Sequence, residues 1–233
     1  MSTRILAIDT ATEACSVALM LDNDLLLERF IFAPRKHTQY VLPMVDDLLA
    51  EANITLKNLD ALAFSSGPGS FTGIRIGIGI AQGLALGANL PLISVSTLVA
   101  LAEGAWRQTG IYQVLTAIDA RMGEVYWAPY QRQAGVWLTK EREAIMAPEA
   151  LSTLSKNLSG CWATAGTGWQ TYPNLLHHEG LTLISGNTLF SNARDILSIA
   201  LHYYHHGSIQ PVTLVEPTYL HDKVAWKKLS DRV

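Results

Sequence analysis

The sequence predicts an α/β protein made of two copies of one strand-rich unit. Residues 4–9 read RILAID and recur as VLTAID at 114–119, and each copy is followed by a short turn and a second apolar segment. In the first copy, strands then alternate with helical segments, which is typical of a layered α/β domain. We therefore expect two mixed-sheet subdomains, residues 1–109 and 110–233.

In the first copy, strands are expected at 4–9, 15–21 and 25–32, where apolar runs are separated by short turns. A helix is expected at 37–53, because apolar residues recur there at helical spacing and Pro43 lies near the start. The remaining expected elements are a strand at 59–64, a glycine-rich helix at 73–88, a strand at 92–95 and a helix at 96–106.

The second copy is expected to continue with further strands and two helices. Strands are predicted at 114–119, 124–130, 136–140 and 161–165, and helices at 148–158 and 191–206. The last helix should end at Gly207, since a left-handed glycine commonly ends helices. Beyond Pro217, we expect Tyr219, Leu220 and Trp226 to order the tail.

Composition excludes several classes of protein. The chain has 233 residues, of which 49% are hydrophobic and 16% charged, so it can bury a large core. A net charge of −3 argues against binding nucleic acid unaided, because phosphate contacts need a basic surface. Cys15 and Cys161 lack metal-site spacing, and no signal peptide is recognisable. These features favour a cytoplasmic protein with two buried thiols.

The most unusual segment is a glycine turn that leads into a glycine-striped helix. Seven of the 17 glycines lie between Gly67 and Gly87, and each helical one costs roughly 1 kcal/mol relative to alanine. Only close approach of another backbone or a ligand compensates for this cost. No P-loop lysine follows the turn, and Ser70 or Thr72 is the expected N-cap. Arg75 is the single charge between residues 61 and 102, so burial in the fold or under a partner is expected.

The helix offers two small-residue faces, either of which would permit close packing. One carries Gly79, Gly83 and Gly87, and the other is built from Gly73, Gly77, Ala81 and Ala85. A membrane span is not expected, because Gln82, the glycines and the break at residues 89–91 leave no run of about 20 apolar residues.

Three stretches carry a resemblance to a known family: residues 5–19, 67–75 and 117–126. Two strand-turn-strand units, each with an aspartate at the end of its first strand, resemble the actin-like ATPase (ASKHA) superfamily, whose fold is duplicated and ribonuclease H-like. Within it, the three stretches resemble a family of accessory proteins of bacterial tRNA threonylcarbamoyladenosine synthesis. The match extends to residues 166–170 and 224–228.

The resemblance implies a non-catalytic scaffold for modification of adenosine 37 in tRNAs that read codons beginning with A. The implied partners are the catalytic paralogue TsaD, the P-loop ATPase TsaE, and tRNA only indirectly through the complex. Alone, the chain is expected to form a homodimer, and no membrane partner is implied. Pairing through the first two helices implies the following interface residues: Val41, Met44, Val45, Leu48, Ile76, Gly79, Ile80, Gly83, Leu84 and Gly87.

The resemblance also locates the positions where relatives bind nucleotide and metal. The nucleotide positions are Asp9, Thr10, Asp119, Gly166 and Gly168, and the metal histidines of the paralogue align with Thr97 and Leu101. Neither of those two side chains binds metal as histidine does, so no metal and no catalytic residue is expected. Ala11, Glu13 and Trp169 crowd the nucleotide positions, so cofactor binding is expected to be absent or restricted to weak ATP or ADP binding in the complex.

Some alternatives remain open. A stand-alone actin-like phosphotransferase or ATPase that uses Asp9 is the competing function. His37 is expected to help cap the first helix. His202, His205 and His206 have the spacing of a metal site, but near a helix C-terminus they are expected to complement the dipole. The basic tail residues Lys223, Lys227, Lys228 and Arg232 are expected to be solvated, with contact to tRNA or a partner as the alternative.

Overall fold

The computed structural model describes residues 3–22, 25–139, 141–154, 158–177 and 179–220. Its first sheet contains five strands in the order β3-β2-β1-β4-β5. Their bounds are β1 Ile5–Asp9, β2 Ala14–Leu21, β3 Leu25–Phe32, β4 Ala61–Gly67 and β5 Leu92–Ser96. Strands β1, β2 and β3 pair antiparallel, whereas β4 pairs parallel with both β1 and β5.

The second sheet repeats the first. Read from β8, its order is β8-β7-β6-β10-β11, with two antiparallel pairings followed by two parallel ones. The strands are β6 Gln113–Arg121, β7 Glu124–Gln133, β8 Val136–Leu138, β10 Gly160–Ala165 and β11 Leu181–Thr188, and a short β9, Ala144–Met146, pairs with β7. Each strand of the first sheet thus has a counterpart in the second, to which β9 is an addition, and this confirms the predicted duplicated fold.

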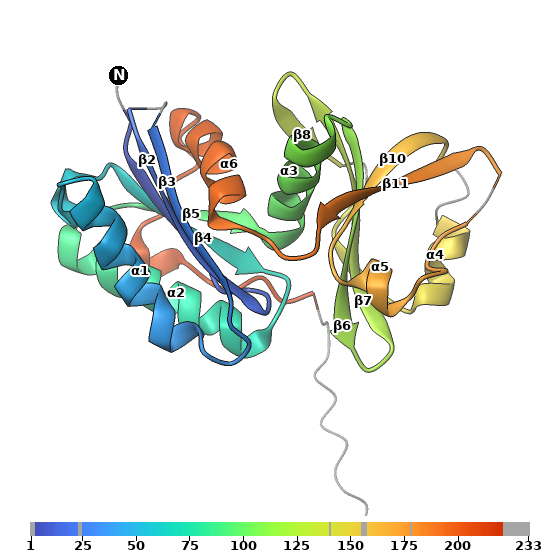
Figure 1. The fold of residues 1–233 in the computed structure, drawn as a ribbon, viewed down its shortest axis with the longest axis horizontal. Coiled ribbons are helices and arrows are strands. Elements are labelled where there is room, and N and C mark those ends of the chain that lie inside the picture. The colour runs from blue at the N-terminus through green and yellow to red at the C-terminus, as the bar shows by residue number, and fades with distance from the viewer. Residues whose placement is uncertain (1–2, 23–24, 140, 155–157, 178, 221–233) are drawn as a thin grey trace, which may run out of the picture.

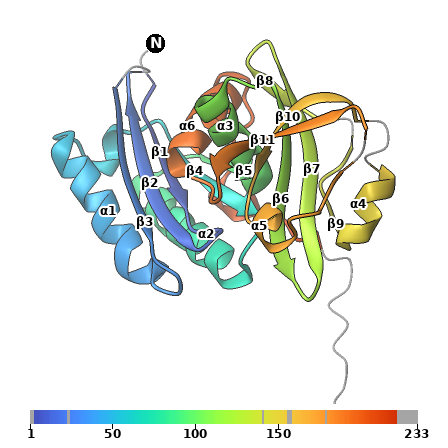
Figure 2. The same cartoon turned by 45° about the vertical axis from the view of Figure 1, so that its right-hand side comes forward.

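Helices form layers around the two sheets (Figure 1). The long helices α1 His37–Glu51 and α2 Phe71–Ala88 cover the outer face of the first sheet, with the short turn η1 Leu56–Asn58 between them. Helices α3 Thr97–Thr109 and α6 Ala193–His205 lie between the sheets, where they share one core with both. The short helices α4 Pro148–Leu154 and α5 Gly168–Thr171 lie on the far side of the second sheet (Figure 2).

The chain returns to the first sheet after completing the second. Helix α6 packs against β1, β2, β4 and β5, and the Ala193 N–H donates to the Ser16 hydroxyl at 2.9 Å. The following residues stay there: Gln210 pairs with Leu92, and η3 Val212–Leu214 lies against α2. Residues 191–219 therefore belong spatially with the first sheet, although they follow the second in sequence.

Most predicted elements are present, with some corrections. Helix α2 begins at Phe71, two residues before the predicted start, and its N-cap is Ser70, one of the two expected residues. Gly207 is left-handed, with φ +72°, and ends α6 as predicted. Strands β9 and β11 and helix α5 were not predicted. Cys161 is exposed, so the expectation of two buried thiols is wrong for this residue, because it lies near the start of β10. Trp226 and the basic tail lie outside the described residues.

Candidate docking face and nucleotide cleft

The glycine turn is packed backbone against backbone on the turn between β1 and β2. A Cβ on Gly69 would lie 2.3 Å from the Ala11 carbonyl oxygen, and one on Gly73 would lie 2.1 Å from that of Thr10. Both distances are shorter than any real Cβ contact. The glycines at these positions therefore bring the start of α2 close to β1, which is a role inside the fold.

The inward face of α2 is the one with Gly73, Gly77, Ala81 and Ala85, all of which are buried. The outward face carries Gly79, Gly83 and Gly87, which are spaced about one helical turn apart, together with Leu86. A Cβ on any of these three glycines would meet nothing within 4 Å, and Leu86 is 74% exposed. We call these four residues the outer glycine face.

Helix α2 is unusually apolar for a helix with so much free surface. By length and composition alone it could cross a membrane, with a mean hydropathy of 1.3, yet only 33% of its residues are buried. Its inner side packs on β4 and in the outer core of the first sheet. The exposed remainder is an apolar surface without a partner in the described part of the monomer.

The predicted interface is wrong for three residues of α1. Val41, Val45 and Leu48 are at most 1% exposed, because they form the core between α1 and the first sheet. The outward apolar residue of α1 is instead Leu42, which is 45% exposed and was missed. A helical stripe shows which residues share a face, but not by itself whether that face is covered.

The other predicted interface residues lie at or near the surface. Gly79, Gly83 and Gly87 are exposed, and four larger side chains are half-buried at the borders of the helices: Met44, Ile76, Ile80 and Leu84. Docking through these residues stays a prediction.

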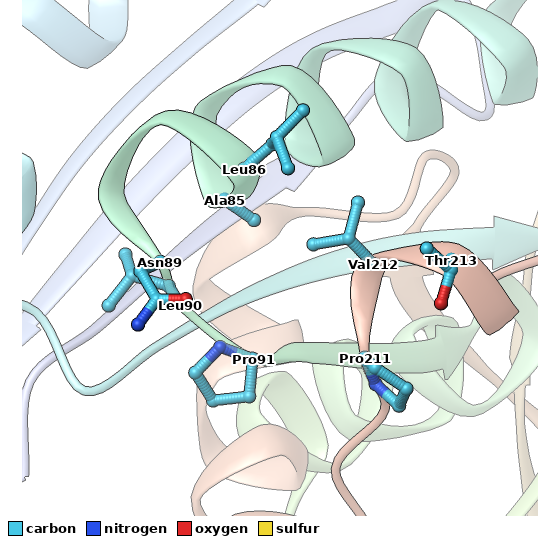
Figure 3. A pocket seen from close by; sticks show the side chains of 8 residues that line it. All are labelled: Ala85, Leu86, Asn89, Leu90, Pro91, Pro211, Val212 and Thr213. Carbon is cyan, nitrogen blue, oxygen red and sulfur yellow. The ribbon is translucent and has the colours of Figure 1, made fainter.

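A small hollow borders the outer glycine face at the C-terminal end of α2 (Figure 3). Its volume is about 330 Å³. Side chains from the end of α2 line one side, and Pro211, Val212 and Thr213 line the other. The segment after α6 therefore completes the surface that α2 presents.

Asp9, the first predicted nucleotide residue, is turned into the protein. Its Oδ1 accepts hydrogen bonds from the Ala11 N–H at 2.9 Å and the Ser65 hydroxyl at 2.5 Å, and its Oδ2 is buried without a partner among the described residues. Its charge adds to burial in raising the pKa of the Cys15 thiol to about 12. Ser65 was missed, because only the pairing of β4 with β1 brings it to Asp9.

Two groups at this turn that could bind a phosphate, a hydroxyl and a backbone N–H, instead donate hydrogen bonds within the protein. The Thr10 hydroxyl donates to the Gly73 carbonyl at 2.7 Å, and the Ser70 N–H donates to the Ala11 carbonyl at 2.7 Å. A helix N-terminus binds anions through free N–H groups, and in α2 one of these groups, the Gly73 N–H, donates to the Ser70 hydroxyl at 3.2 Å instead. The residues at the first turn therefore do not fit a tightly bound polyphosphate with its metal ion.

The second turn is built in the same way. A Cβ on Gly166 would lie 2.2 Å from the Ala117 carbonyl oxygen, and one on Gly168 would lie 2.9 Å from the Ala117 Cβ. The Asp119 carboxylate accepts from the Arg121 N–H at 3.0 Å, which forms a local turn. Trp169 packs into the outer core of the second sheet, with its ring 6.0 Å from that of Trp127.

A large cleft of about 1260 Å³ separates the two turns. It is lined by the β1–β2 and β6–β7 turns and by the start of α2. The Arg121 guanidinium lies 3.1 Å from the Glu13 carboxylate, so one ion pair links the two subdomains across it. At the rim, the Arg75 guanidinium stacks 3.5 Å from the Phe71 ring centre, near Tyr219. The bridging role of Arg121 was missed, because it arises only in the tertiary structure.

The histidine predictions have mixed outcomes. The N-cap of α1 is Lys36, without a side-chain hydrogen bond, so a capping role for His37 is wrong. The His37 Nε2 instead lies 2.8 Å from the Thr12 carbonyl and 3.1 Å from that of Ala14, which ties α1 to the β1–β2 turn. His202 and His205 do lie in the last turn of α6.

No metal cluster is found in the part of the chain that the structure describes, where no three His, Cys, Asp or Glu side chains converge. Thr97 and Leu101, for which the family resemblance implied alignment with the metal histidines of the paralogue, are completely buried.

Two sheets with identical strand order, each with a glycine turn packed beside the aspartate of its central strand, define this chain as a protein of the actin-like class. Comparisons with known proteins identify the family. Residues 31–186 match the family model described as TsaD, tRNA N6-adenosine threonylcarbamoyltransferase. The chain belongs to the TsaB (YeaZ) family of tRNA threonylcarbamoyladenosine biosynthesis proteins.

The relatives match over nearly their full length. The Escherichia coli TsaB is 55% identical, with 97% of this chain and 98% of the relative covered. The Haemophilus influenzae TsaB is 39% identical, with 98% of each chain covered. The solved structure of YeaZ from Pseudomonas aeruginosa has a TM-score of 0.85 at 41% identity, covering 94% of this chain and all of that one.

Proposed function

We propose that this chain is the non-catalytic scaffold of a cytoplasmic tRNA threonylcarbamoyl transferase. It binds the catalytic paralogue TsaD through the outer glycine face and so supports modification of adenosine 37 in tRNAs that read codons beginning with A. The P-loop ATPase TsaE joins this pair, tRNA is reached through the complex, and the free chain forms a homodimer through the same face.

The outer glycine face is the observation that carries the proposal. Apolar patches on soluble proteins are commonly covered by a partner. Gly79, Gly83 and Gly87 have no internal neighbour that requires glycine, in contrast to Gly73. They nevertheless carry the helix cost of glycine, roughly 1 kcal/mol each. A partner helix that approaches the backbone closely accounts for this cost.

Two further observations support the scaffold role. The match to the TsaD family model over residues 31–186 indicates that the proposed partner shares this fold, so the two subunits would pair as paralogues. The first aspartate turn is filled by Ser65, Ser70 and Thr10, and completely buried Thr97 and Leu101 occupy the positions aligned with the metal histidines. These features favour a chain that contributes a binding surface to the complex rather than a catalytic residue.

The decisive test is Gly83→Leu. Because a side chain at this position meets nothing in the monomer, the variant should fold normally but should lose co-elution with TsaD. Gly83→Ala should keep most of the binding. Thr153→Leu, at an exposed position of α4 at the other end of the molecule, is a control that should bind normally. Normal co-elution of a folded Gly83→Leu protein would contradict the proposed interface.

Cellular and enzymatic measurements separate the scaffold from the competing function. Depletion of the protein should lower threonylcarbamoyladenosine in bulk tRNA, and an unchanged level would refute the pathway role. Asp9→Asn should support modification as well as the unaltered chain does. Robust ATP turnover by the isolated chain, lost in Asp9→Asn, would instead establish a stand-alone actin-like ATPase or phosphotransferase.

A further inference from the structure

The last turn of α6 brings two imidazoles together on the surface. His202 and His206 are one helical turn apart, and their ring centres are 4.0 Å from each other. The backbone N–H of His206 donates to the His202 carbonyl at 3.2 Å, so the helical turn between them is intact. Gly207 and Ser208 then donate to the carbonyls of Tyr204 and Tyr203, which closes the helix end and fixes this geometry.

The hydrogen bonding of the His206 ring leaves its Nε2 atom free to bind a metal ion. Its Nδ1 lies 2.8 Å from the carbonyl oxygen of His202. A carbonyl oxygen only accepts hydrogen bonds, so Nδ1 carries the proton in the neutral ring and Nε2 keeps a lone pair. Metal-bound histidines typically have this arrangement, in which the second ring nitrogen donates to a carbonyl or carboxylate and orients the ring.

We propose that His202 and His206 bind one divalent transition-metal ion of the borderline class, such as Ni²⁺ or Zn²⁺, with water at the remaining positions. Imidazole ligands suit these ions and disfavour Mg²⁺. No third His, Cys, Asp or Glu converges there among the described residues, so the site is open and its affinity modest. This site is separate from the outer glycine face and does not depend on the scaffold role.

His205 serves as a control, because it is a neighbouring surface histidine outside the proposed metal site. His205 is three residues after His202, which is also a possible metal-site spacing, but it does not share the face of His206, because adjacent residues of an α-helix are about 100° apart around the axis. Its ring instead meets the Tyr204 ring edge-on, with centres 5.9 Å apart. His205 and His206 are exposed and His202 is half-buried on the surface, so substitutions at all three positions leave the core unchanged.

The test is calorimetric titration of the full, untagged chain with NiCl₂, and with MgCl₂ as the negative control. One Ni²⁺ should bind per chain. His202→Ala and His206→Ala should each weaken binding at least about tenfold, whereas His205→Ala should bind as the unaltered chain does. Equal Ni²⁺ affinity in the His202→Ala/His206→Ala double variant, or an equal loss in His205→Ala, would overturn the proposal.

Thermal unfolding provides an independent readout. An ion that binds only the folded chain raises its unfolding temperature, because it shifts the folding equilibrium by mass action. Ni²⁺ should therefore raise the unfolding temperature of the unaltered chain and of His205→Ala, but not of His202→Ala. The same rise in His202→Ala would count against the site, and circular dichroism without metal verifies that each variant is folded.

Discussion

Thr10 holds Gly73 by two contacts, one attractive and one that excludes any larger residue. Its hydroxyl donates to the Gly73 carbonyl at 2.7 Å, and its own carbonyl oxygen occupies the space where a Gly73 Cβ would lie, 2.1 Å away. The end of β1 and the start of α2 therefore meet through their backbones. The glycine turn that leads into α2 therefore acts as an internal junction.

This junction predicts opposite effects for two glycine substitutions in one helix. Gly73→Ala should destabilise the protein by at least roughly 1–3 kcal/mol, because the new methyl group overlaps backbone that cannot move aside cheaply. Gly83→Ala should stabilise it by roughly 0.5–1 kcal/mol, since alanine favours the helix and meets nothing. Urea unfolding of both variants measures the difference, and the same sign for both would contradict this assignment of faces.

The N-cap of α2 gives a second prediction. The Ser70 hydroxyl accepts from the Gly73 N–H at 3.2 Å, so Ser70→Ala should lower the free energy of unfolding by about 1 kcal/mol. Thr72→Ala is the control, because Thr72 is exposed and does not act as the cap, and it should have little effect. Equal losses in both variants would show that the measured effect is not capping.

A third prediction concerns the ion pair between α3 and α6. Arg107 binds both carboxylate oxygens of Asp195, at 2.7 and 3.1 Å, and Asp195 is only 2% exposed. Arg107→Ala leaves this carboxylate buried without its partner, which typically costs about 3–5 kcal/mol. Chemical unfolding at neutral pH measures the loss, and Arg107→Lys should recover part of it.

The stability loss in Arg107→Ala should depend on pH, and the sign of this dependence follows from the pKa of Asp195. Burial raises this pKa above its ordinary value of 3.8, and Arg107 opposes the rise. A raised folded-state pKa gives stability at low pH that is lost as the pH rises through that pKa. Without Arg107 the pKa rises further, so the deficit of Arg107→Ala should be larger near about pH 7 than near about pH 4. An equal deficit at both values would contradict this account.

The two cysteines should differ in reactivity. Burial, assisted by the charge of Asp9, raises the pKa of the Cys15 thiol from 9.0 to about 12, whereas Cys161 is exposed. The thiolate is the reactive form. Iodoacetamide should therefore modify Cys161 in the native protein and both residues after unfolding in urea, as read by peptide mass spectrometry. Rapid native modification of Cys15 would contradict its burial.

The same shift implies a loss of stability in alkali. The unfolded chain releases the Cys15 proton above about pH 9, whereas the folded chain retains it until about pH 12. The contribution of this thiol to stability should therefore decline through that interval. In Cys15→Ala, the decline of unfolding free energy between these values should be shallower than in the unaltered chain, and an unchanged slope would contradict the assignment.

Much of the fold follows from the sequence because local signals and burial agree there. The strand at 25–32 is predicted to the residue, since it is a mostly apolar run that follows the polar turn at residues 22–24. Strand β11 was missed because it is half-exposed and is interrupted near Gly186 by a register shift against β10. Gly186 allows the Thr164 carbonyl to approach within 2.5 Å of where its Cβ would lie, which is a tertiary requirement.

The candidate site was less predictable, because its residues come from segments far apart in the chain. Which glycines of α2 face inward depends on Thr10, more than 60 residues away. The burial of Val41 depends on the first sheet beneath α1, and the link from Glu13 to Arg121 depends on both subdomains. The spacing of residues in the sequence identified the faces of α1 and α2, but only the packing of the folded chain showed which of these faces are buried.

The return of α6 to the first sheet constrains how the chain folds during synthesis. One face of β1, β2, β4 and β5 is covered by residues 193–205, which the ribosome makes long after those strands. Domains generally fold as units while they emerge, N-terminal first. Here this face of the first sheet gains its α6 cover only after residues 193–205 have been synthesised, so the core of the first half closes late in translation.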